Sequence, residues 1–233
     1  MNLHGIITGD IVASQKIDPL VRQKLYADAD LFLQQLKNSW ISQYETYRGD
    51  SLQCEAQQPE QSLRIALMIR SFFKAYIPKK DETTAASTTK KVRSAKGYFA
   101  TAFDIRLAVG IGSVDFIQKD KISTSDGQAF RLSGEALDDL KTESYRMAIK
   151  TLHPDFNELM EAPVLLLDAL MQKWTQNGAE VVLYKLQNKK DDEIADILKI
   201  SQPAVNQRKK NAYWDAVEKL ITYFEKSVLS WTE

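Results

Sequence analysis

The stretch Tyr44-Glu-Thr-Tyr-Arg-Gly-Asp-Ser-Leu-Gln-Cys-Glu-Ala56 places β-favouring residues on both sides of a Gly49–Asp50 pair. A glycine–aspartate pair between such residues indicates a β-hairpin with a tight turn. An earlier stretch, Ile6-Ile-Thr-Gly-Asp-Ile-Val12, is apolar and β-branched, and it predicts a buried strand ending in Gly9 and Asp10. Each stretch therefore brings one carboxylate to the end of a strand.

Helical segments flank this hairpin. Apolar residues recur at three- and four-residue spacing over residues 19–40 and 59–76, and a strand pattern follows at 103–112. The order β-α-β-β-α-β is that of the split βαβ unit in ferredoxin-like domains. In that unit the first two strands run parallel and the third lies antiparallel between them. We therefore expect an α+β fold with Asp10 and Asp50 side by side at one rim of the sheet.

Two carboxylates at one rim suit Mg²⁺ or Mn²⁺, which a few carboxylates can hold while leaving room for phosphate oxygens. The plainer alternative is that Asp10 and Asp50 only cap turns. Two distant histidines, His4 and His153, and one cysteine do not support a zinc cluster.

Composition narrows the class of protein. The 233 residues carry 31 acidic and 31 basic side chains, so no overall field indicates nucleic acid or a membrane surface. A lone cysteine, Cys54, excludes an internal disulfide framework and is expected to be a packed core thiol. No apolar run is long enough for a membrane helix, and we expect a cytoplasmic protein. In the helical segment 59–76, Arg70 and Lys74 predict a face that turns polar towards its end. Residues 78–96 contain almost no large apolar side chain and predict a surface loop.

Beyond residue 154 the sequence predicts helices, one of which begins at Pro163. The clearest pattern in this part of the sequence is residues 191–210. Ile194, Ala195 and Leu198 give a short helix a buried face, a turn follows, and Val205 points back to the core. This spacing predicts a helix-turn-helix that binds DNA, whose second helix enters the major groove. The alternative is a helical hairpin with a solvated basic face. The predicted DNA contacts, by cap or exposed polar type, are Ser201, Gln202, Asn206, Gln207, Arg208, Lys209 and Lys210.

The motifs 7–14 (Ile-Thr-Gly-Asp-Ile-Val-Ala-Ser), 48–51 (Arg-Gly-Asp-Ser), 105–112 and 126–130, with the helix-turn-helix, resemble the SatD family. The first part also resembles the palm domain of class III nucleotidyl cyclases and GGDEF-type enzymes. The resemblance implies that Asp10, Asp50 and the carbonyl of Ile11 bind metal ions around a nucleotide triphosphate. It likewise implies nucleotide contacts from Gly49, Arg106, Gly127 and Arg131.

Active cyclases carry an asparagine and, four residues on, an arginine in the helix after the glycine turn. Here the corresponding residues are Arg131 and Glu135, so an acidic group stands where transition-state charge should be neutralised. The hairpin also departs from the Gly-Gly-Asp-Glu-Phe motif. These departures favour ligand binding over catalysis.

The leading hypothesis is a two-domain, dimeric regulator. Residues 1–155 would form a cyclase-like palm domain that binds a metal–nucleotide or related ligand, and residues 160–233 a helix-turn-helix domain that binds DNA. The rival hypothesis is a metal-dependent nucleotidyl cyclase or nucleotidyltransferase that uses Asp10 and Asp50. A third is a protein-interaction module whose C-terminal helices bind a partner.

Overall fold

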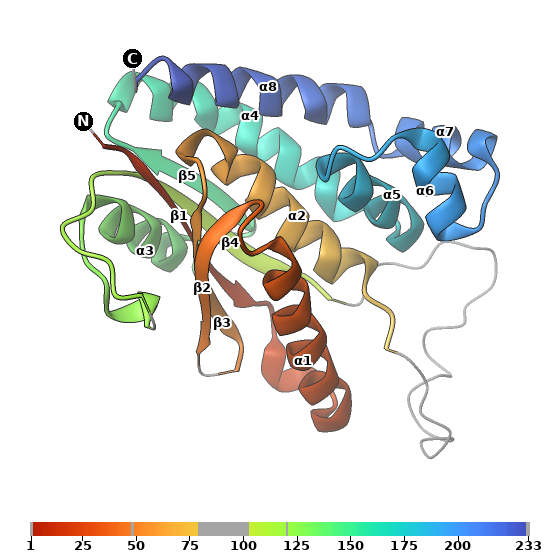
Figure 1. Ribbon diagram of the computed structural model, residues 1–233, viewed down its shortest axis with the longest axis horizontal. Coiled ribbons are helices and arrows are strands. Elements are labelled where there is room, and N and C mark those ends of the chain that lie inside the picture. The colour runs from red at the N-terminus through yellow and green to blue at the C-terminus, as the bar shows by residue number, and fades with distance from the viewer. Residues whose placement is uncertain (1, 48, 79–102, 120, 232–233) are drawn as a thin grey trace.

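A computed structural model describes residues 2–47, 49–78, 103–119 and 121–231 (Figure 1). The surface loop expected at 78–96 lies, from residue 79 on, outside these ranges. The elements in chain order are β1 (His4–Ile11), η1 (Ser14–Lys16), α1 (Pro19–Leu36), β2 (Ile41–Tyr47), β3 (Ser51–Ala56), η2 (Pro59–Gln61), α2 (Ser62–Ala75), β4 (Ile105–Gly112), η3 (Ile122–Thr124), α3 (Gln128–Leu140), β5 (Met147–Thr151), α4 (Pro154–Lys173), α5 (Gln176–Leu186), α6 (Asp191–Leu198), α7 (Gln202–Asn211) and α8 (Trp214–Leu229).

The five strands form one mixed sheet in the order β2-β3-β1-β4-β5. β3 lies antiparallel between β1 and β2, and β4 pairs antiparallel with the other side of β1. These directions confirm the α+β class and the strand arrangement expected from the sequence. β5 adds a parallel strand beside β4 at the far edge.

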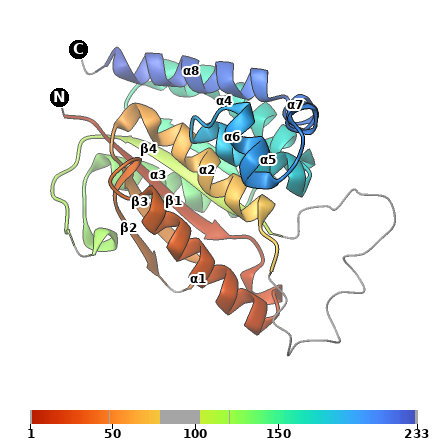
Figure 2. The same cartoon turned by 45° about the vertical axis from the view of Figure 1, so that its right-hand side comes forward.

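Alternate residues of β4 face two different helical layers, because successive side chains of a strand point to opposite faces. Leu107 and Val109 belong to the main core beneath α1 and α2, whereas Ala108 packs against α3. Gly110 lets α3 approach closely, since a Cβ there would lie 2.3 Å from the carbonyl oxygen of Ala129. Figure 2 shows α1 and α2 on one side of the sheet and α3 on the other.

The C-terminal helices continue the main core rather than beginning a separate one. A single cluster of buried apolar residues runs from the sheet through α2 into α4, α5 and α8, and includes Met160, Trp174, Val182 and Phe224. α4 is one helix of 20 residues with Pro163 inside it, so the expectation that Pro163 opens a helix is wrong. Among the described residues, no helix combines the length and the apolar character needed to cross a bilayer.

The outer edge of β5 is partly closed by a side chain. The N–H of Thr151 donates to Asn157 Oδ1 and the Nδ2 of Asn157 donates to the Thr151 carbonyl, both over 2.9 Å. Asn157 thus bonds to both peptide groups of the last residue of β5, as a further strand would do.

Candidate functional site

The end of β1 and the β2–β3 turn meet at one rim of the sheet, as the sequence predicted. Asp10 lies opposite Ser51 in the β1–β3 register, and the N–H of Ile11 donates to the Asp50 carbonyl over 2.8 Å. Gly49 has a φ of 79°, which the turn requires, and a Cβ there would lie 2.9 Å from the ring of Tyr26. The chain geometry therefore brings Asp10 and Asp50 together.

Asp10 is held by a cation from the neighbouring strand. Its Oδ2 accepts a hydrogen bond of 2.8 Å from Arg106, while its Oδ1 is buried with no hydrogen-bond partner among the described residues. Burial raises the pKa of Asp10; Arg106 and Lys141 act in the opposite direction, and nearby Asp50 raises it slightly further. An unpartnered buried oxygen in this place is chemically suited to a cation.

Asp50 has partners on the other side of the rim. Its Oδ2 accepts a 2.7 Å hydrogen bond from the hydroxyl of Ser14, which follows β1 in the short helix η1. The two carboxylates therefore make different hydrogen bonds, one to Arg106 and one to Ser14. The β1–β3 register and the bond from Ile11 to the Asp50 carbonyl nevertheless keep the two residues in one neighbourhood.

The rim offers two carboxylates and backbone carbonyls, such as that of Ile11, to a metal ion. Within the described ranges, no three His, Cys, Asp or Glu side chains gather in a way that could hold a metal. Such a donor set fits Mg²⁺ or Mn²⁺, which usually take one or two carboxylates and complete their shell with water and phosphate oxygens. Asp10, Asp50 and the Ile11 carbonyl could therefore hold such an ion only if other ligands completed its shell.

Lys141 is a cation near Asp10 that the sequence did not reveal. It lies at the end of α3, half-exposed, and its Nζ bonds to Asp138 over 2.6 Å. The hydrogen bond that Lys141 donates to Asp138 raises the pKa of Lys141, and the charge of Asp10 adds to that effect. Arg106 and Lys141 together give the rim two positive groups, which could contact an anionic ligand.

Two of the predicted nucleotide contacts lie at the opposite end of α3. Gly127 precedes the first residue of α3 and packs against the backbone of Val114, and Arg131 forms ion pairs with Asp126 (2.7 Å) and Asp115 (3.5 Å). The residue of β4 beside this end of α3 is Gly112, whereas Arg106, near the other end of β4, lies beside Asp10. Gly127 and Arg131 therefore lie away from Asp10 and Asp50, because α3 runs along the sheet between the two ends. Their contact with a nucleotide stays a prediction.

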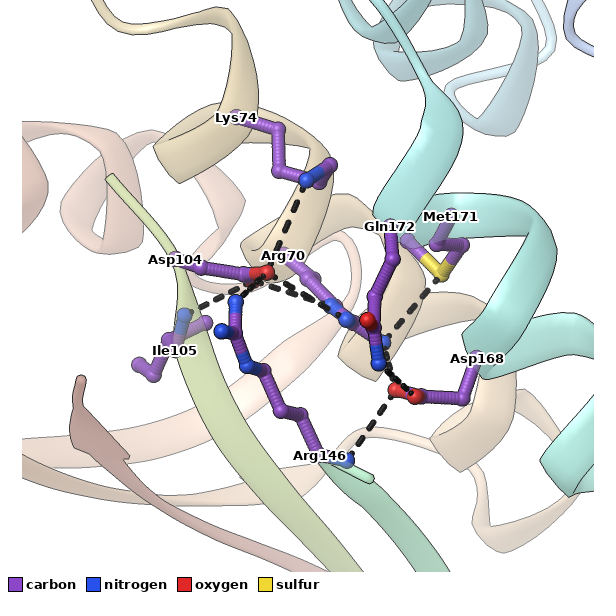
Figure 3. Close-up of polar contacts among 8 residues, drawn as sticks. All are labelled: Arg70, Lys74, Asp104, Ile105, Arg146, Asp168, Met171 and Gln172. Atoms are coloured by element: carbon purple, nitrogen blue, oxygen red, sulfur yellow. Dashed lines mark hydrogen bonds and ion pairs between the residues drawn. The ribbon is translucent and has the colours of Figure 1, made fainter. Parts of the chain in front are cut away.

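A buried charged cluster joins α2 to α4 (Figure 3). Arg70 is fully buried and donates to Asp104 over 3.0 Å and to Asp168 over 2.5 Å. Arg146 and Lys74 also pair with Asp104. The polar helix face expected from Arg70 and Lys74 is thus wrong: both side chains are buried and satisfied by carboxylates from elements far away in the sequence.

This cluster has consequences for protonation. Burial acts to raise the pKa of Asp104, but the charges of Arg70, Lys74 and Arg146 outweigh it and hold the pKa below its ordinary value. Burial lowers the pKa of Lys74, and Asp104 opposes that effect. The carbonyl of Asp104 accepts from the N–H of Val12 over 2.9 Å, so the cluster also supports the chain directly after β1.

Helices α6 and α7 are joined by a three-residue turn and pack on α5. Lys199 adopts the left-handed conformation that ends α6, and the hydroxyl of Ser201 caps α7 by accepting from the N–H of Ala204 over 3.4 Å. Val205 is fully buried against Val181 and Ile194. The residues that α7 exposes are Gln202, Pro203, Asn206, Gln207, Lys210 and Asn211.

Arg208 and Lys209 differ from the expectation that they lie outside. Arg208 pairs with Glu180 of α5 over 3.3 Å, and Lys209 pairs with Asp191 of α6 over 2.5 Å. Burial acts to raise the pKa of Asp191, but hydrogen bonds from Lys209 and Lys185 hold it below its ordinary value. Both basic residues therefore tie α7 to its neighbouring helices, a role that helical spacing alone does not show.

Comparison with known proteins gives little guidance here. No protein-family model and no curated protein matches the chain. Among solved structures, a bacterial light-regulated adenylyl cyclase is similar at 14% identity with a TM-score of 0.37, over 69% of this chain and 79% of that one. A likeness at this level carries no argument, and the resemblance to the SatD family stays a prediction.

Proposed function

We propose that this protein is a DNA-binding regulator of the SatD type whose helix α7 enters the major groove. The observation that supports this most directly is the outer face of α7, where Gln202, Asn206, Gln207 and Lys210 are exposed together. Amide side chains can pair with adenine edges, and a lysine can hold a phosphate. Buried Val205 and the Ser201 cap fix the helix that presents them.

In this proposal residues 160–233 carry the helix-turn-helix and residues 1–155 a ferredoxin-like, cyclase-like palm, and the two parts share the main core through α4. A ligand bound at the Asp10–Asp50 rim would alter DNA affinity only by its different affinity for two arrangements of the chain. A homodimer suits this function, because two-fold operators pair two recognition helices.

The test is binding to a set of genomic DNA fragments at low and moderate salt, followed by fluorescence anisotropy. Asn206→Ala should reduce the binding free energy by about 1–3 kcal/mol for the preferred fragment only. Lys210→Ala should weaken binding to all fragments and lower the slope of log affinity against log salt concentration by about 1. Lys219→Ala, an exposed lysine of α8, is the matched control and should change nothing. Equal, weak binding by the wild type and by a variant lacking all four α7 side chains would refute the proposal.

A second candidate is a Mg²⁺- or Mn²⁺-dependent nucleotidyl cyclase or nucleotidyltransferase at the rim. The buried, unpartnered Oδ1 of Asp10 beside Asp50 favours it. Asp10, Asp50 and the Ile11 carbonyl would hold the ion, which would neutralise phosphate charge, and Arg106 and Lys141 would face the phosphates. Incubation with each NTP and Mn²⁺, followed by chromatography, tests it: a product absent in Asp50→Asn supports an enzyme, and no product with any NTP removes it.

A further inference from the structure

One face of α4 stays exposed along the whole helix. Its residues follow at alternating spacings of four and three, which is the spacing of a helix–helix seam. Leu159 and Leu166 expose 55% and 72% of their surface, although both are large and apolar. The exposed row consists of Asp155, Leu159, Ala162, Leu166, Ala169 and Lys173.

The row is complementary to itself when it is reversed. In two helices packed antiparallel about a two-fold axis, residues equally far from the axis on either side lie opposite one another. With the axis crossing the exposed face at the level of the buried Val164, Leu159 faces Ala169 and Leu166 faces Ala162. Each large side chain then meets a small one, as close packing of helices requires.

The charges follow the same symmetry. Asp155, in the first turn of α4, falls opposite Lys173, in its last turn. A two-fold pair would therefore close the apolar seam with an opposite-charge pair at each end. A partner of unrelated sequence would have to reproduce both the alternation in size and the order of the charges, whereas a second copy of this chain supplies them automatically.

We propose that this face of α4 binds the same face of a second copy in an antiparallel, two-fold dimer. The inference goes beyond the proposed function, since it depends on α4 alone. A dimer can form whether or not α7 binds DNA. Failure of the DNA-binding test would leave this dimer untouched, and a monomeric chain could still bind DNA.

Sedimentation velocity over a range of concentrations tests the seam. Leu166→Glu should weaken the dimer at least tenfold, because it buries a charge opposite Ala162. Leu31→Glu is the control: Leu31 lies on α1 and is 54% exposed, so the dimer should persist. Cooperative thermal unfolding of both variants shows that they fold. A wild type that stays monomeric at all concentrations, or a dimer unaffected by Leu166→Glu, would overturn the proposal.

Charge reversal tests the register. Asp155→Lys and Lys173→Asp should each weaken the dimer, and the two together in one chain should restore it. A mere loss of helix stability would not be restored by the second reversal. If the double variant dimerises no better than the single ones, the register is wrong and the proposal fails.

Cysteine cross-linking provides an independent distance test. A mixture of Asp155→Cys and Lys173→Cys proteins should form a disulfide-linked heterodimer under mild oxidation. Either protein alone should not, because the same residue in the two copies would be about 27 Å apart along the helix. The native Cys54 is buried and does not compete. Linkage of each variant to itself, with none between the two, would contradict the antiparallel arrangement.

Discussion

Arg106 of β4 donates a 2.8 Å hydrogen bond to the carboxylate of Asp10, directly across the β1–β4 ladder. The guanidinium thus occupies one oxygen of the residue that the sequence singles out as a metal ligand, and the other oxygen is buried without a partner in the described structure. A cation on the free oxygen would therefore compete with Arg106 for the negative charge of one carboxylate.

This competition can be measured. Arg106→Gln should increase the affinity for Mn²⁺ about tenfold, or about 1.4 kcal/mol, because the guanidinium no longer neutralises the same carboxylate and repels the ion. Asp10→Asn should abolish binding. Isothermal titration calorimetry with Mn²⁺ alone gives both values, and Lys150→Gln, which removes a cation paired with Asp139 of α3, is the control. Weaker binding by Arg106→Gln would show that Arg106 supports the ion instead of competing with it.

Two glycines at the start and in the middle of α3 predict opposite effects of the same substitution. Gly127→Ala should destabilise the protein by about 1–3 kcal/mol, because φ is 146° and the new Cβ would lie 2.5 Å from the backbone of Val114. Gly134→Ala should stabilise it by about 0.5–1 kcal/mol, since nothing lies within 4 Å and alanine favours a helix. Urea unfolding gives the change in the free energy of unfolding for each variant. Equal changes would contradict the strain expected at Gly127.

Removing Arg70 should be far more costly than removing an exposed arginine. Arg70→Met leaves the buried carboxylates of Asp104 and Asp168 without their shared partner, which should cost about 3–5 kcal/mol. Arg131→Met removes ion pairs of a side chain that is 54% exposed and should cost about 0–1 kcal/mol. Chemical denaturation measures both. A loss below 1 kcal/mol for Arg70→Met would show that the cluster contributes no net stability.

Acid should weaken the same cluster. The pKa of Asp104 lies below its ordinary value in the folded protein, so the folded state binds the proton less readily than the unfolded chain. The stabilisation from Asp104 is therefore fully present above the ordinary aspartate pKa, about 3.9, and is lost as pH falls through the lower folded value. The free energy of unfolding of Asp104→Asn should accordingly depend less on pH in that acidic window. An unchanged slope would assign the acid sensitivity to other carboxylates.

Local patterns were sufficient to predict the sheet. The Gly49–Asp50 turn and the β-α-β-β-α-β order determine which strands are neighbours, and that alone brings Asp10 to Asp50. The partners of charged side chains were not predictable, because an ion pair between distant segments leaves no periodic signal. Arg70 resembles a surface residue at its place in the helix, yet Asp168 satisfies it from 98 residues away.

The predicted helix start at Pro163 was wrong for a related reason. Pro163 normally marks a helix start, but here the apolar face of α4 continues through it, and burial of Met160, Val164 and Leu167 on both sides outweighs the lost backbone bond. Arg208 and Lys209 looked solvated because the acidic residues that pair with them, Glu180 and Asp191, belong to other helices.

The pair of bonds between Asn157 and Thr151 has a consequence for behaviour in concentrated solution. An uncovered β-strand margin can recruit other chains and seed fibrils. By occupying the terminal amide and carbonyl of β5 with a carboxamide, the molecule shortens the stretch on which an intruding strand could grow. Replacing that carboxamide would lengthen the open margin and make the protein more prone to precipitate.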